Sequence, residues 1–357
     1  MNHAARVDKM IDLLDRESVD AFLVADLLNV RYLTGFSGTA GAVLIHAGGA
    51  IFYTDGRYRA RAGDLVQGAE IAIYRERVSE LLPQALADRN IKTLGFEAEQ
   101  LTVAQRDDFE RDLPVELRPT RGVVADLRRS KEPSEIAAIK EAVRLADEAF
   151  EQVLTRLTPG ANEREVALFL EVTMRESGAD EVSFPPIVGS GTHAAHIHHT
   201  PTTREFQRDE LVLLDFGARV DGYCSDLTRT VVLGSATDEL RERYRLVFDA
   251  QERGIAQVAP KVACRGVDSA ARSVIEQAGQ GDLFAHGLGH GVGLDIHEAP
   301  RLNRESNQTL VEGDVVTVEP GIYDPAWGGI RIEDCVHVSA SGPEVLAKAP
   351  KHELIEV

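Results

Sequence analysis

Hydrophobic positions in the first third of the chain alternate between runs typical of strands and spacings typical of helices. Residues 20–26 and 42–54 are apolar and rich in β-branched and aromatic side chains, so we predict that they form strands. The segment 32–41 between them is rich in Gly, Ser and Thr and is predicted to be a loop. Residues 77–88 and 101–112 have helical spacing. This alternation predicts a small α/β domain at the N-terminus.

The pattern changes ahead of Pro133, where a proline in the first turn marks the start of a long predicted helix. One face of this helix is apolar, at Ile136, Ile139, Val143, Leu145, Ala149 and Val153. Further along, apolar strands predominate, and predicted helices at 236–258 and 266–278 separate two pairs of them. We therefore predict an α/β domain over residues 1–125 and an α+β domain over residues 126–357, in which antiparallel hairpins face one core.

Composition and charge narrow the class of protein and its partners. The 357 residues are 43% hydrophobic and 27% charged, as in a globular protein of two domains. The net charge of −19 argues against nucleic acid and anionic membrane as partners. No apolar stretch approaches the roughly 18 residues of a membrane helix. Three scattered cysteines form no CxxC pair, so we predict reduced thiols and a cytoplasmic location.

The N-terminus is charged throughout and lacks the apolar core of a signal peptide. We predict instead an amphipathic helix with one apolar face, formed by Val7, Met10, Ile11 and Leu14.

Two predicted hairpins each carry a pair of carboxylates at the end of an apolar strand. Asp215 ends one such strand, and Asp226 opens the strand that returns after a short turn. Glu319 follows a second apolar strand, and Glu333 lies on the strand that returns from a glycine-containing turn. Burying unpaired carboxylates costs several kcal/mol each, and two nearby arginines cannot neutralise all four. The pattern therefore favours bound metal ions.

Histidines form two clusters close to these hairpins. His286, His290 and His297 fall within a glycine-rich segment between the hairpins, and glycine permits the close backbone approach that metal sites need. The second cluster, which includes His198 and His199, precedes the first hairpin. Four carboxylates and an imidazole suit two hard or borderline divalent cations. Such a pair can share a hydroxide and bind a carbonyl oxygen, so the residues predict two-metal hydrolysis. They do not identify the substrate.

The motifs around these residues resemble those of the pita-bread metallopeptidases, in the branch that contains Xaa-Pro dipeptidase (prolidase) and Xaa-Pro aminopeptidase. In chain order they read LLDFGARVDGYCSDLTRT, HGLGHGVGLDIHEAPR, VVTVEPGIY and GGIRIED. YLTGFSGTAG and FYTDGRY are similar to the N-terminal domain of the same branch, so nearly the whole chain is covered. The resemblance implies a creatinase-like α/β domain followed by an α+β pita-bread (creatinase/aminopeptidase-like) catalytic domain.

The resemblance also implies a role for each matching residue. Two divalent metal ions would be bound by Asp215, Asp226, His290, Glu319 and Glu333. Of these residues, Asp226 and Glu333 would bridge the two ions. Glu319 would also move the proton between the nucleophilic water and the leaving nitrogen, and His297 would stabilise the tetrahedral oxyanion. His198 falls at the family's substrate-contacting histidine. Ile197 replaces the proline usual before it, however, and the adjacent His199 is a second candidate.

Two arginines complete the expected substrate-binding set. Arg331 resembles a residue that orients Glu333. Arg301, in the segment HEAPR, resembles the prolidase arginine that meets the free carboxylate of a dipeptide. The mixture of carboxylates and imidazole favours Mn²⁺, with Co²⁺ or Zn²⁺ as alternatives. The family commonly forms homodimers, which implies a homodimer here.

The expected reaction is hydrolysis of the bond between an N-terminal residue and proline in short peptides, favoured as that of an Xaa-Pro dipeptidase. Xaa-Pro aminopeptidase, acting on longer peptides, shares every motif. Methionine aminopeptidase shares the metal chemistry, but the N-terminal domain and the GIRIED context argue against it. Creatinase lacks metals, and non-catalytic binding proteins on this scaffold lose ligands, whereas all five ligands are present here.

Overall fold

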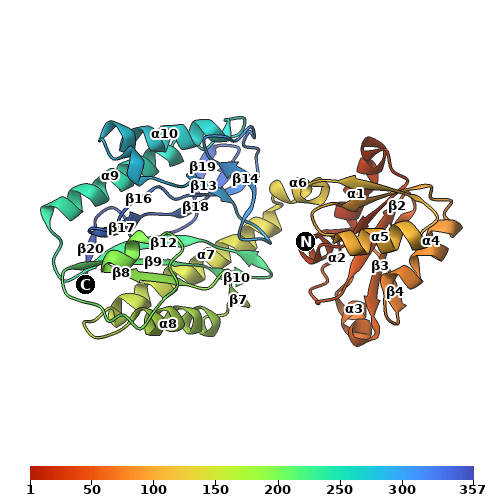
Figure 1. Ribbon diagram of the computed structural model, residues 1–357, viewed down its shortest axis with the longest axis horizontal. Coiled ribbons are helices and arrows are strands. Elements are labelled where there is room, and N and C mark those ends of the chain that lie inside the picture. Colours follow the sequence, from red (N-terminus) through yellow and green to blue (C-terminus); the bar gives the residue numbers. More distant parts are fainter. The chain divides into compact units, whose positions relative to one another are not determined.

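The computed structural model describes residues 1–357, and the chain divides into two units, Met1–Arg128 and Arg129–Val357. The elements of each unit are labelled in Figure 1. None of the helices combines the length and the apolar character that a membrane crossing would need.

The N-terminal unit is built on a mixed six-stranded sheet with the order β4-β3-β2-β1-β5-β6. Its strands are β1 (Ala21–Val24), β2 (Ala42–His46), β3 (Gly49–Asp55), β4 (Glu70–Tyr74), β5 (Thr93–Glu97) and β6 (Glu116–Thr120). Its helices are α1 (His3–Glu17), α2 (Leu27–Thr34), α3 (Arg59–Leu65), α4 (Leu82–Asp88), α5 (Val103–Asp112) and α6 (Val123–Arg129). Side chains of α4 and α5 pack with Leu23 and Leu44 in one buried cluster.

Two predictions for this unit were wrong in detail. Residues 42–54 form a hairpin rather than one strand, because the chain reverses before Gly49, whose φ of +132° suits glycine. The predicted loop 32–41 begins inside α2, a helix that starts where the Asp26 side chain accepts hydrogen bonds from the backbone N–H groups of Leu28 and Asn29. The amphipathic N-terminal helix and the helices near 77–88 and 101–112 are confirmed as α1, α4 and α5.

The C-terminal unit pairs two sheets with two pairs of helices (Figure 1). A four-stranded sheet has the order β20-β12-β9-β8, and a five-stranded sheet has the order β14-β13-β15-β18-β19. The helices α7 (Pro133–Val153) and α8 (Glu163–Glu176) pack on the first sheet, whereas α9 (Asp238–Ile255) and α10 (Cys264–Gln277) pack on the second. The predicted apolar face of α7 is fully buried. Sequence patterning gave no prediction for α8.

The strands of this unit are short. They are β7 (Glu181–Val182), β8 (Ile187–Ser190), β9 (Glu210–Phe216), β10 (Ala218–Val220), β11 (Tyr223–Cys224), β12 (Leu227–Leu233), β13 (Gly289–Gly291), β14 (Glu298–Leu302), β15 (Val315–Val318), β16 (Gly321–Asp324), β17 (Gly328–Arg331), β18 (Asp334–Ser339), β19 (Gly342–Val345) and β20 (Ile355–Glu356). Smaller sheets join β11-β10-β7 and β16-β17.

Candidate metal centre

The two acidic hairpins are built alike, and each is interrupted near its middle. In the first, β9 pairs with β12 and the chain continues into the β10-β11 pair; in the second, β15 pairs with β18 and the chain continues into β16-β17. Asp226 and Glu333 stand at these interruptions, directly before β12 and β18, while Asp215 lies near the end of β9 and Glu319 directly follows β15. A bridge between Thr228 and Glu333 joins the hairpins, so the four carboxylates meet.

His290 reaches the same point from β13, the strand beside β15. A side chain at Gly291 would overlap the carbonyl oxygen of Ala299, so glycine is needed where β13 approaches β14. His290 Nδ1 lies 3.1 Å from the Gly291 carbonyl oxygen, to which it donates. Its Nε2 then faces Asp226 Oδ2 at 3.6 Å and Glu319 Oε1 at 3.4 Å. The imidazole therefore presents a lone pair to the carboxylates.

Burial makes this group of charges unfavourable by itself. Burial, with repulsion from the neighbouring carboxylates, raises the pKa of Asp226 and of Glu333 well above the ordinary range. Burial likewise raises the pKa of Glu319 to about 7 and lowers the pKa of His290 to about 3. A cation among these groups would favour ionised carboxylates and a neutral imidazole, which are the forms that bind metals.

The donor atoms fit divalent cations. Ligand atoms of Asp226, His290 and Glu333 all lie within 4.8 Å of one another. Asp215 Oδ1 is buried and has no hydrogen-bond partner, although such atoms are rarely left unpaired in folded proteins. Oxygen ligands with one imidazole nitrogen are typical of hard and borderline divalent metals.

Arg331 lies against Asp215 rather than against Glu333, the partner expected from the sequence. Its Nη2 donates to Asp215 Oδ2 at 2.5 Å, and the guanidinium is buried. It reaches Glu333 only through Thr228, whose hydroxyl lies 3.1 Å from Arg331 Nε and donates to Glu333 Oε2 at 2.6 Å. A third partner, Tyr323, accepts from Arg331 Nη1 at 3.0 Å. The side chain therefore ties both hairpins together.

Sequence reasoning missed Thr228 and Tyr323. Thr228 could have been found, because alternate residues of a strand point to the same face, and it follows Asp226 by two positions. Tyr323 carries no comparable signal. It receives its role from contacts with Arg331 and with His286 Nε2, which lies 2.9 Å from its hydroxyl oxygen.

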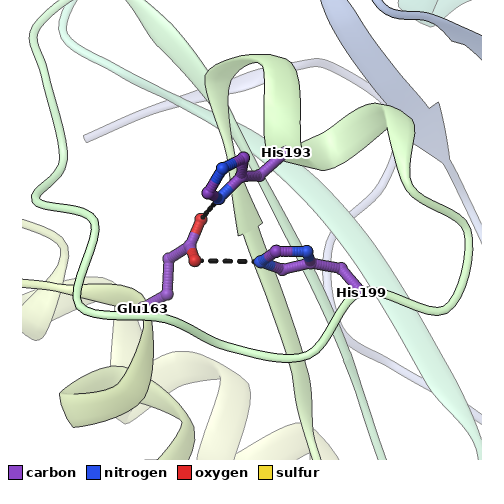
Figure 2. A group of neighbouring side chains, drawn as sticks. All are labelled: Glu163, His193 and His199. Atoms are coloured by element: carbon purple, nitrogen blue, oxygen red, sulfur yellow. Dashed lines mark hydrogen bonds and ion pairs between the residues drawn. The ribbon is translucent and has the colours of Figure 1, made fainter.

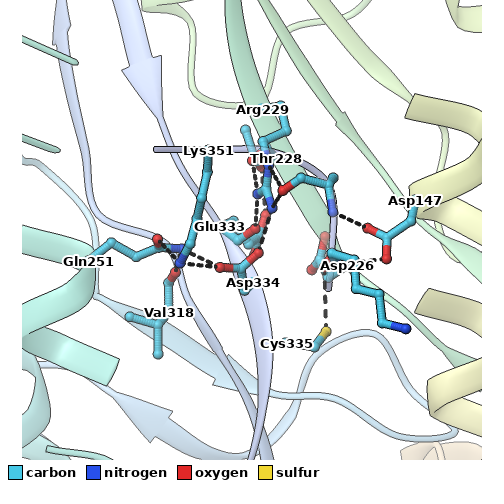
Figure 3. A network of polar contacts seen from close by, with 12 residues as sticks. Asp147, Asp226, Thr228, Arg229, Gln251, Val318, Glu333, Asp334, Cys335 and Lys351 are labelled. Carbon is cyan, nitrogen blue, oxygen red and sulfur yellow. Dashed lines mark hydrogen bonds and ion pairs between the residues drawn. The ribbon is translucent and has the colours of Figure 1, made fainter. Parts of the chain in front are cut away.

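A second buried network fixes the backbone beside Glu333 (Figure 3). Asp334 accepts hydrogen bonds from Arg229 Nη2 and from Lys351 Nζ, each at 2.7 Å. Arg229 Nη1 also donates to the carbonyl oxygens of Glu333 at 2.6 Å and Thr228 at 2.9 Å. Although burial opposes ionisation, the charges of Arg229 and Lys351 lower the pKa of Asp334. The start of β18 is thereby held to β12.

The carboxylates open onto a cleft of about 500 Å³. All nine residues predicted for the site line this cleft: His198, Asp215, Asp226, His290, His297, Arg301, Glu319, Arg331 and Glu333. The imidazole centroids of His297 and His290 are 4.3 Å apart. An apolar wall that the sequence did not predict adds Phe184, Pro185, Pro186 and Ile187.

His198 and His199 differ in their surroundings. Both line the cleft, and His198 is exposed there. The side chain of His199 is only 7% exposed, and its Nε2 lies 2.9 Å from Glu163 Oε2. Of the two, His198 therefore has the ring that is free to meet a ligand.

Buried carboxylates and one imidazole at the base of an open cleft are typical of metal-dependent hydrolases. The sequence comparisons specify which one. Residues 137–340 match Metallopeptidase family M24, and residues 6–130 match the Creatinase/Prolidase N-terminal domain. The chain belongs to metallopeptidase family M24. These matches confirm the predicted fold class, a creatinase-type α/β domain followed by a pita-bread catalytic domain.

Similar proteins align with this chain from end to end. The Xaa-Pro dipeptidase of Pyrococcus furiosus is 34% identical, over 98% of this chain and 99% of its own length. The structure of an Xaa-Pro dipeptidase from Bacillus anthracis superposes with a TM-score of 0.97 at 40% identity and covers 100% of both chains. The structure of an X-Pro aminopeptidase from Thermotoga maritima has a TM-score of 0.91 at 32% identity and covers 98% of this chain and 99% of its own.

Proposed function

We propose that this chain hydrolyses the bond between an N-terminal residue and proline, as an Xaa-Pro dipeptidase (prolidase). The observation that carries the proposal is the meeting of Asp215, Asp226, His290, Glu319 and Glu333 at the base of one cleft. The similarity over nearly the whole chain to proteins named Xaa-Pro dipeptidase supports the choice of substrate.

In this proposal the five residues would hold two divalent ions, and Asp226 and Glu333 would supply ligand atoms beside His290. Mn²⁺ is the proposed metal because carboxylates favour hard cations and the imidazole favours a borderline one. When bound, such ions polarise the scissile carbonyl and lower the pKa of the attacking water. Glu319, whose side chain is 16% exposed, would carry a proton from the attacking water to the leaving nitrogen.

The histidines and Arg301 are proposed to bind the substrate. His198 and His297 are exposed in the cleft, where they would contact the scissile carbonyl and stabilise its oxyanion. Arg301 lines the same cleft, is exposed and makes no ion pair within the chain. Its guanidinium is therefore available for the C-terminal carboxylate of a dipeptide, which it would hold through two hydrogen bonds. Arg331, already paired with Asp215, would act by orienting that ligand.

A second candidate is an Xaa-Pro aminopeptidase that accepts longer peptides. A second hollow, of about 430 Å³, shares His286, Gly287 and Asn303 with the cleft and provides room for further residues. The similarity to the Thermotoga maritima X-Pro aminopeptidase points the same way.

Substrate length separates the two candidates. With Mn²⁺ added, a dipeptidase should give a higher kcat/KM for Ala-Pro than for Ala-Pro-Ala, and the order should reverse for an aminopeptidase. Ala-Gly and Met-Ala serve as controls without proline. Cleavage of Met-Ala in preference to both proline peptides would contradict the proposal and favour methionine aminopeptidase.

We also propose a homodimer in the cytoplasm. The three cysteines are buried and unpaired, as is usual in a reducing compartment. The dimer rests on resemblance to the family, and sedimentation at micromolar concentration tests it: a monomer there would contradict this part of the proposal.

A further inference from the structure

Glu163, in the first turn of α8, is a buried acceptor for one surface loop. Its Oε1 accepts hydrogen bonds from the Ser190 N–H (3.0 Å), the Ser190 hydroxyl (2.9 Å) and His193 Nδ1 (2.9 Å). Its Oε2 accepts from His199 Nε2 (2.9 Å), the Thr202 N–H (3.0 Å) and the Thr202 hydroxyl (2.7 Å). Figure 2 shows both imidazoles directed at the carboxylate. One side chain thus fixes four residues of the segment 190–202.

This cluster is an anchor rather than a second metal site. Ligand atoms of Glu163, His193 and His199 lie within 4.8 Å of one another, as metal ligands do. A carboxylate, however, offers about four lone-pair positions, and six hydrogen-bond donors, three on each oxygen, already share them. Although burial opposes ionisation, the hydrogen bonds from His199 and Thr202 lower the pKa of Glu163 to about 2. The ionised carboxylate is therefore stabilised without a cation.

The anchored segment carries His198 into the cleft. On one side of His198, the ring of His199 is bound to Glu163. On the other side, the Ile197 carbonyl oxygen accepts from Arg331 Nη1 at 3.4 Å, and Arg331 in turn holds Asp215. Because both neighbours are tied, one to α8 and one to the metal-ligand hairpins, the backbone of His198 has little freedom to move.

We propose that Glu163 is a positioning residue that holds His198 at the reacting carbonyl. This inference rests on the proposed function, in which His198 contacts the substrate. A misplacement of about 1 Å can cost about 10²-fold in rate, so a firm anchor outside the site affects catalysis directly. His199, which occupies the anchor, is a positioning residue by the same argument.

The test is the Glu163→Gln variant, measured for kcat and KM on Ala-Pro with Mn²⁺. Glutamine keeps the shape but has one acceptor oxygen, so half of the donors would face an amide NH₂ group. We expect kcat/KM to fall about 10- to 100-fold, with bound metal unchanged. Glu165→Gln is the matched control, since Glu165 lies in the same turn of α8 and is exposed. It should stay within about twofold of the wild type, as surface substitutions do.

A double-mutant cycle separates positioning from a general structural effect. In a His198→Ala background, Glu163→Gln should lower kcat/KM by no more than about twofold, because the residue that it positions is already gone. An equal loss in both backgrounds would overturn the inference, as would wild-type activity in Glu163→Gln. A metal ion lost together with Glu163 would overturn it too, because the cluster would then be a metal site.

A second variant and the wild-type control distinguish failure of folding, of the proposed function and of the role of Glu163. Should Glu163→Gln fail to fold, Thr202→Val is the second variant. It removes the 2.7 Å hydroxyl bond to Glu163 and the 3.1 Å bond that the hydroxyl accepts from the Arg204 N–H, and it keeps the Thr202 N–H bond to Glu163. The same non-additivity with His198→Ala is expected. If the wild-type protein cleaves no Xaa-Pro peptide, the proposed function itself fails. If the wild type cleaves Ala-Pro but the variants show additive losses, only the role of Glu163 fails.

Discussion

Glu333→Gln should make the metal-free protein more stable and the metal-loaded protein less stable than the wild type. Glu333 is 2% exposed, and burial together with the neighbouring carboxylates raises its pKa well above the ordinary range. Its ionisation therefore opposes folding at neutral pH when no cation is present. Glutamine has nearly the same shape, can still accept from Thr228, and donates through its NH₂ group to the carboxylates around it.

Removing this unfavourable buried charge should stabilise the metal-free protein by about 1–3 kcal/mol. Each kcal/mol shifts Tm by about 2–4 °C in a unit of 150–250 residues. In the wild type, Mn²⁺ at about 1,000 times its Kd should add about 4.1 kcal/mol, more than the advantage of the metal-free variant. The variant lacks a proposed metal ligand and should gain little. The order of the two Tm values should therefore reverse when Mn²⁺ is added.

Thermal unfolding in EDTA and in excess Mn²⁺ measures this reversal. The ordinary pKa of the glutamate carboxyl is 4.5, so the advantage of glutamine in EDTA should disappear as the pH falls below about 4.5. A variant that is less stable than the wild type in EDTA at neutral pH would refute the reasoning about buried charge. A variant that gains as much Tm from Mn²⁺ as the wild type would refute the assignment of Glu333 as a ligand.

Three further predictions follow from the same geometry. Arg301→Ala should raise the KM for Ala-Pro about tenfold, which corresponds to about 1.4 kcal/mol, and should change the KM for Ala-Pro-Ala much less. Equal effects on both peptides would contradict the proposal that Arg301 binds the substrate carboxylate. Thr228→Val removes the 2.6 Å hydrogen bond to Glu333, so Mn²⁺ affinity measured by calorimetry should fall about 10- to 100-fold, and unchanged affinity would contradict the supporting role of Thr228. Because burial raises the pKa values of Asp226 and Glu319, Mn²⁺ binding near neutral pH should release protons. Calorimetry in buffers of different ionisation enthalpy measures this release, and binding heats that are the same in all buffers would contradict it.

The group of carboxylates in the cleft was predictable from the sequence because each of them stands at or beside the end of an apolar strand. Asp215 and Glu319 each interrupt an apolar run, and a buried carboxylate in such a position must be compensated by hydrogen bonds, a cationic side chain or a metal ion. The glycines around His290 likewise marked a place where backbones approach closely. Local pattern was sufficient at these positions, since each signal lies within a few residues of the group that it concerns.

Partners that are far apart in the sequence could not be predicted in this way. Arg331 was expected beside Glu333, two residues away, but the fold turns its guanidinium to Asp215 across the two hairpins. Glu163 gave no signal at all, because its donors lie 27 to 39 residues further along the chain. The short helix α2 was missed for a different, local reason: the strand predicted over residues 20–26 included its capping residue, Asp26, although β1 ends at Val24.

Titration of the metal-free protein with Mn²⁺ tests the central claim most directly, if bound metal and Ala-Pro hydrolysis are followed in the same samples. Metal-free protein should have no activity, and hydrolysis should rise with bound Mn²⁺ to a plateau at about two ions per chain. Full hydrolysis of Ala-Pro after removal of all metal, or saturation with metal without hydrolysis of any Xaa-Pro peptide, would contradict the account.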